Sequence, residues 1–216
     1  MEGWAEVLVP GFFAGLVAMA VPAAIERFGG LTGGLLGTVP STIVPAAIGI
    51  RGTAPDEALF VASMAMVPAG MFLNAVFLWL WRVLPPTLPP WPIIARLAVM
   101  VVVSLGVWLA LAVGVVQGGE RLILRGIPAM ALGLGGTLAI VVLGVVACWR
   151  YVPAPPGARS VPPWMHLCRG VLAWAAIASA VWLSSVGGAV AAGIASIFPA
   201  IFVTTMVALW LSQGEA

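Results

Sequence analysis

The chain has 216 residues, of which 62% are hydrophobic and only 7% are charged. Soluble domains carry about 25% charged residues, so this chain lacks the polar surface that a soluble globular protein needs. Its mean hydropathy of +1.16 agrees. We therefore expect an all-α integral membrane protein whose solvent is the lipid bilayer. The small net charge of +2 argues against nucleic acid as a partner.

Charged residues divide the chain into apolar segments of about 20 residues, the length that crosses a bilayer as a helix. The last interval, 170–214, is about twice that length. It contains the turn-like sequence 184–188, Ser-Ser-Val-Gly-Gly, which divides it into two spans. The sequence predicts a single polytopic domain over residues 1–216 with seven transmembrane helices, at 7–25, 28–50, 58–81, 97–119, 126–149 and two within 170–214.

Two proline-rich segments, 84–92 and 152–163, are predicted to connect helices three and four and helices five and six. Asp56 and Glu57 follow a proline and are typical of a helix start. The connections after helices one, three and five hold six arginines: Arg27, Arg82, Arg96, Arg150, Arg159 and Arg169. The opposite side holds Arg51, Arg121 and Arg125. This asymmetry predicts a multi-pass protein of the cell membrane with its N-terminus outside and its C-terminus in the cytoplasm.

The two ends of the chain resemble each other at an offset of 159 residues. This offset aligns Gly11 with Gly170, Ala14 with Ala173, Gly29 with Gly188, Gly34 with Gly193, and Pro40 with Pro199. Helices one and two would then match helices six and seven, five crossings later. An odd number of crossings makes the repeat inverted, an arrangement found in many secondary transporters. The alternative is convergent packing of small residues, which membrane helices favour generally.

Helices two and seven are each expected to break at a proline, Pro40 and Pro199. A proline frees a carbonyl one turn earlier, and in lipid that carbonyl needs a partner or a cavity. Hydroxyls surround both prolines, and Asn74 adds a side-chain amide in the third span. The candidate substrate-binding residues are therefore Thr38, Pro40, Ser41, Thr42, Asn74, Ser196, Pro199, Thr204 and Thr205. The alternatives are a simple kink whose hydroxyls bond to their own backbone and, for Asn74, a bond to a neighbouring helix.

Two groups of soft ligands are candidate metal sites. Met64, Met66 and Met71 lie near Pro68, but thioethers two positions apart point to different helix faces. Met165, His166 and Cys168, with Cys148, lie at the ends of helices five and six. Ordinary packing explains both groups better. With one histidine and no charged residue near the centre of a predicted span, we expect no metal, no cofactor and no enzyme activity.

The leading hypothesis is a small membrane transporter or facilitator that moves a small solute or ion between helices two and seven. An anion would be favoured if half-helix N-termini point at the site. We expect the chain to form a homodimer. The alternatives are a channel-like pore made by several copies and a non-transporting subunit that packs against a partner membrane protein.

Overall fold

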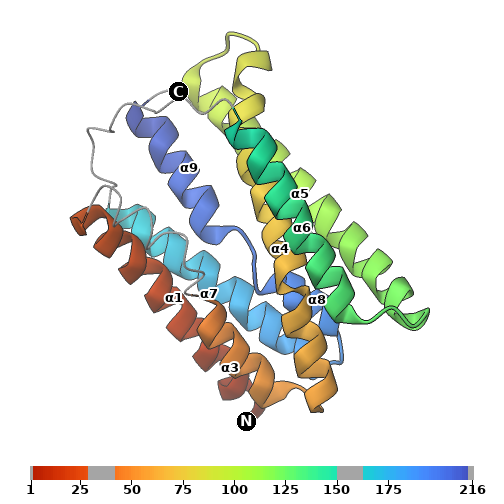
Figure 1. The fold of residues 1–216 in the computed structure, drawn as a ribbon. Helices are drawn as coiled ribbons and strands as arrows, with labels where there is room; N and C mark the ends of the chain where they lie inside the picture. The colour runs from red at the N-terminus through yellow and green to blue at the C-terminus, as the bar shows by residue number, and fades with distance from the viewer. Residues whose placement is uncertain (1, 29–41, 150–162, 214–216) are drawn as a thin grey trace.

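The computed structural model describes residues 2–28, 42–149 and 163–213, which form helices and no strand. The helices are α1 (Glu2–Phe28), α3 (Ile43–Thr53), α4 (Glu57–Val83), the short 3-10 helix η1 (Pro85–Thr87), α5 (Ile93–Leu124), α6 (Ala129–Cys148), α7 (Pro163–Ser185), α8 (Ala189–Ala195) and α9 (Ala200–Gln213). They pack as one elongated bundle (Figure 1).

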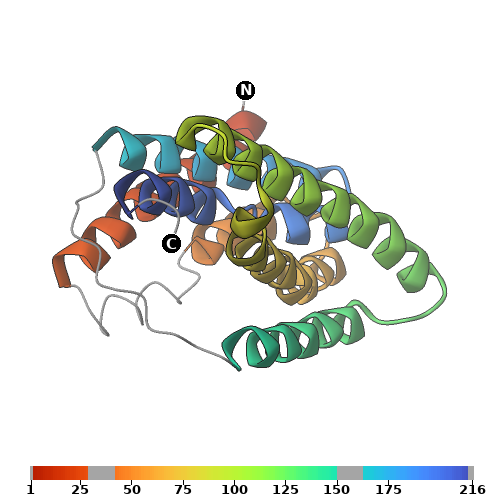
Figure 2. The same cartoon turned by 90° about the horizontal axis from the view of Figure 1, so that it is seen from above.

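Five described segments are long and apolar enough to cross a membrane: α4, α5, α6, α7, and the stretch 189–211 that contains α8 and α9. Helix α1, with 27 residues, runs antiparallel beside α7 (Figure 1). Seen from above, α6 lies at the periphery and packs along α4 (Figure 2). The chain is therefore an all-α, multi-pass membrane protein, as its composition predicted.

The start of α1 and the end of α9 lie at opposite ends of the bundle (Figure 1). Helix α3 has only 11 residues, so it accounts for the second half of the predicted span 28–50. The first half of that span falls within residues 29–41, outside the described residues. The count of seven crossings thus stays a prediction, although the opposite positions of the two ends agree with an odd number.

Local signals in the sequence place several helix ends correctly. The side chain of Asp56 accepts a hydrogen bond from the backbone N–H of Leu59 over 2.7 Å and caps α4, which starts at Glu57. The turn predicted at 184–188 separates α7 from α8, and Gly187 has a φ of +85° there. A side chain at this φ would be strained, so glycine fits the turn.

Small residues bring pairs of helices into close contact. Gly15 packs against the carbonyl group of Gly170, and Gly11 packs against that of Trp174, where α1 crosses α7. Gly133 and Gly136 of α6 pack in the same way against the backbone of α4. The spacing of Gly11 and Gly15 therefore serves helix packing.

Candidate membrane-embedded site

The last span is discontinuous. Helix α8 ends at Ala195 and α9 begins at Ala200, with residues 196–199 between them (Figure 1). The break predicted at Pro199 is confirmed. The hydroxyl of Ser196 donates to the carbonyl of Gly193 over 2.7 Å, so this side chain bonds to its own helix, as the simple-kink alternative expected.

Asn74, on the neighbouring helix α4, makes a hydrogen bond to the backbone at the break. Its Nδ2 donates to the carbonyl oxygen of Ile197 over 2.9 Å, and its Oδ1 accepts from Nε1 of Trp108 over 2.9 Å. Trp108 also meets Phe198 edge to face, with ring centroids 5.4 Å apart. Asn74 is 7% exposed, and both ends of its amide are engaged within the protein. Its observed role is to bind a neighbouring helix and position the break.

A buried arginine on α7 contacts α9, the helix that follows the break. Arg169 is 1% exposed and belongs to α7. Its Nε donates to Oγ1 of Thr204 over 2.9 Å, and its Nη2 donates to Oγ1 of Thr205 over 3.1 Å. Both threonines are predicted site residues, and both accept a hydrogen bond from this guanidinium.

Arg169 was predicted to lie in a loop between helices, and that prediction is wrong. The charge of Arg169 marks the start of the last apolar interval, 170–214, which is why a loop was predicted there. The helix instead begins at Pro163, a residue type that suits the first helical position, so Arg169 lies in the second turn. The proline at 163 was the signal that could have shown this.

This cluster places the positive charge of the Arg169 guanidinium next to two threonine hydroxyls. Oγ1 of Thr204 donates to the carbonyl of Ala200 over 2.9 Å, so it faces Arg169 as an acceptor. The guanidinium is thereby fixed near the first turns of α9, whose N-terminus carries a partial positive charge. A charged side chain inside a membrane bundle is rare and usually has a functional role.

The other candidate residues are not joined to this cluster. Thr42 directly precedes α3 and its side chain makes no capping hydrogen bond. Within the described ranges no hydrogen bond connects Thr42 to Thr204 or Thr205. Thr38, Pro40 and Ser41 lie outside the described residues. The structure thus displays one half of the predicted site, the half built on helix seven.

The soft-ligand groups do not form a recognisable site in the described part of the chain. Met66 is 1% exposed in the core between α4 and α8, whereas Met64 packs against a different cluster around α3 and α7. Cys168 is exposed. Among the described residues no group of three or more His, Cys, Asp and Glu side chains could hold a metal ion.

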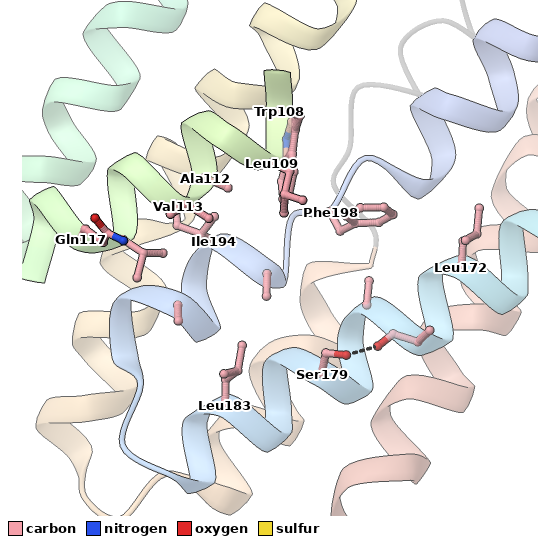
Figure 3. Close-up of a pocket in the computed structure, with 15 residues that line it drawn as sticks. Trp108, Leu109, Ala112, Val113, Gln117, Leu172, Ser179, Leu183, Ile194 and Phe198 are labelled. Atoms are coloured by element: carbon pink, nitrogen blue, oxygen red, sulfur yellow. Dashed lines mark hydrogen bonds between the residues drawn. The ribbon is translucent and has the colours of Figure 1, made fainter. Parts of the chain in front are cut away.

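An apolar groove of about 530 Å³ lies beside the break (Figure 3). Helix α5 forms one wall and α7 the other, and α8 with Phe198 lies between them. We call it the α5–α7 groove; it is lined by Trp108, Leu109, Ala112, Val113, Val116, Gln117, Leu172, Ala175, Ala176, Ser179, Leu183, Ala191, Ile194, Ala195 and Phe198. No sequence pattern predicts this groove, because its α5 wall lies far in the chain from the wall and floor formed by α7 and α8.

The chain matches no protein-family model, no curated protein and no solved structure. Function is therefore inferred from the site alone.

Proposed function

We propose that the chain is a small membrane transporter or facilitator, and that its solute passes the break between α8 and α9 close to Arg169. The observation that carries the proposal is this buried guanidinium, held by Thr204 and Thr205 on the second half of a discontinuous span. Discontinuous helices are the usual framework of solute sites near the middle of a membrane.

The charge of Arg169 narrows the class of solute. Burying a guanidinium inside a membrane protein is costly, and that cost is usually connected with function. Arginine presents a planar set of donors that matches carboxylate and phosphate groups. The solute we favour is accordingly a small anion, or a neutral molecule with strong hydrogen-bond acceptors.

Two contacts support an inverted repeat as the framework of this transporter. At the offset of 159 residues, Gly15 corresponds to Trp174 and Gly11 corresponds to Gly170. The packing of Gly170 on the carbonyl of Gly15 then has a counterpart in the packing of Gly11 on the carbonyl of Trp174. A two-fold axis between α1 and α7 would relate these two contacts, as it would in any antiparallel pair of helices.

The orientation and assembly are part of the same proposal. With Arg169 removed from the loop count, five arginines remain on one side against three on the other, so the N-terminus is still expected outside. We also propose a homodimer in the cell membrane. A dimeric mass in native mass spectrometry across several mild detergents supports it, and a monomeric mass in all of them contradicts it.

Flux into proteoliposomes tests the function. The purified chain is reconstituted and offered a panel of small anionic, neutral and cationic solutes, with protein-free liposomes as the control. We expect saturable uptake of at least one small anion or acceptor-rich solute. A rate far above carrier turnover supports the pore alternative, and a lack of flux for the whole panel supports the non-transporting subunit.

A further inference from the structure

We propose that the α5–α7 groove is a phospholipid site, which binds one acyl chain along its walls and the lipid phosphate at Arg121. This inference does not depend on the transport proposal. It rests on the depth and chemistry of the groove, on its opening toward the membrane, and on the position of one arginine one helical turn beyond its Gln117 end.

The groove has the length and lining of an acyl-chain site. Along α5 it extends from Trp108 to Gln117, about 14 Å at the helical rise of 1.5 Å per residue. One leaflet of the hydrocarbon core is about 15 Å thick. Most lining side chains are aliphatic or aromatic, and small alanines of α7 and α8 leave the space between the walls open (Figure 3).

The groove opens sideways between two membrane spans. Leu109 and Val113 on one wall are 59% and 48% exposed, and Leu172 on the other is 37% exposed. Helices α5 and α7 are not in extensive contact with each other, whereas α8 packs against both. Because both walls are transmembrane helices, the medium that reaches these side chains is lipid hydrocarbon.

A polar end completes the match to a phospholipid. Gln117 lies at the end of the groove away from Trp108 (Figure 3), and Arg121 follows it by four residues, on the same face of α5. Arg121 is exposed, and within the described part of the chain it makes no ion pair. The adjacent Glu120 is also exposed, but one residue along a helix points to a different face. Along this face of α5, the apolar groove is followed by the amide of Gln117 and then by the guanidinium of Arg121. A phospholipid has the same order, from its apolar acyl chain to its charged phosphate.

The end of the groove near Trp108 lies next to the break between α8 and α9. Phe198, one of the residues between α8 and α9, lines the groove next to Trp108. An acyl chain that fills the groove would therefore pack against the break itself. We expect the lipid to stabilise the discontinuous span by apolar packing, as a buried side chain does in a protein core.

Native mass spectrometry of the whole chain tests the site. The protein is stripped of lipid in detergent and titrated with phosphatidylglycerol, and the bound fraction is measured. Ala175→Trp fills the groove from an exposed position on α7, and should lower the fraction with one bound lipid at least fivefold. Leu138→Trp on α6, 67% exposed and outside the groove, is the matched control and should change it less than twofold.

The headgroup is tested by Arg121→Gln, with Arg51→Gln as the control. Arg51 belongs to α3 and reaches Glu57 at 3.9 Å, away from the groove. We expect R121Q to bind phosphatidylglycerol threefold to tenfold more weakly, and R51Q to bind it as the wild type does. Val113→Trp replaces A175W if that variant fails to fold. Unchanged lipid binding in both tryptophan variants overturns the proposal, and a loss of dimer instead of lipid assigns the groove to a second copy of the chain.

Discussion

Asn74 of α4 donates a hydrogen bond to the carbonyl oxygen of Ile197 over 2.9 Å, at the point where α8 and α9 separate. A carbonyl freed by a helix break inside a membrane must be satisfied by another group. The amide of Asn74 supplies that group, and Trp108 in turn holds the amide from α5. The break is therefore braced by two other helices, which makes it a defined part of the fold.

Replacement of Asn74 by leucine is expected to destabilise the protein. Leucine keeps the approximate volume but leaves the Ile197 carbonyl and the Trp108 indole N–H without partners, at a cost of about 1–3 kcal/mol. The measurement is thermal unfolding in detergent. Gln117→Leu removes an exposed amide from α5 and is the matched control, with no expected loss. Equal melting temperatures for N74L and the wild type would show that the bond is not needed to hold the break.

Glycines of α6 give a second test, because neighbouring positions differ in their surroundings. A Cβ at Gly136 would lie 2.7 Å from the backbone nitrogen of Ala69, whereas a Cβ at Gly135 would meet nothing within 4 Å. Gly136→Ala should therefore force α6 away from α4 and cost about 1–3 kcal/mol. Gly135→Ala should be neutral or stabilising by up to about 1 kcal/mol. Melting temperatures that fall equally in both variants are inconsistent with this packing.

Thr204 and Thr205 should respond differently to replacement by valine. Thr204 is 6% exposed and accepts from Nε of the buried Arg169, so T204V should destabilise the fold by about 1–3 kcal/mol. Thr205 is only half-buried, so T205V should destabilise the fold less than T204V does. If Thr205 helps to present the guanidinium to the solute, T205V lowers uptake about fivefold to a hundredfold, the equivalent of about 1–3 kcal/mol. Normal uptake by a stable T205V would remove Thr205 from the site.

The helices and several of their ends could be predicted from the sequence because they depend on local signals. Asp56 caps α4, Gly187 forms the turn after α7, and Pro199 marks the break in the last span. Each of these features follows from the residue itself and its immediate neighbours.

The contacts that define the site could not be predicted in this way, because they join distant parts of the chain. The bond between Asn74 and Ile197 connects residues 123 positions apart. The choice between a loop and a helix for Arg169 required the exact helix start at Pro163, which a count of gaps between charges does not supply. The α5–α7 groove depends on helix packing that no single segment encodes.

The proposed topology makes a separate prediction. A reporter fused after Gln213, the end of α9, should report the cytoplasm. A cysteine introduced at Gly126, in the turn between α5 and α6, should react with an impermeant thiol reagent added outside intact cells, in a background where Cys148 and Cys168 are replaced by serine. Reaction only after the cells are opened would reverse the orientation that the arginine distribution predicts.

Uptake by Arg169 variants in proteoliposomes tests the central claim most directly. Arg169→Gln removes the charge but retains donors, Arg169→Lys retains the charge without the planar set of donors, and Arg125→Gln removes an exposed charge at the end of α5. For equal amounts of folded protein, we predict that uptake of the transported anion falls at least tenfold in R169Q, less in R169K, and not at all in R125Q. Uptake by R169Q at the wild-type rate would contradict a solute pathway beside Arg169.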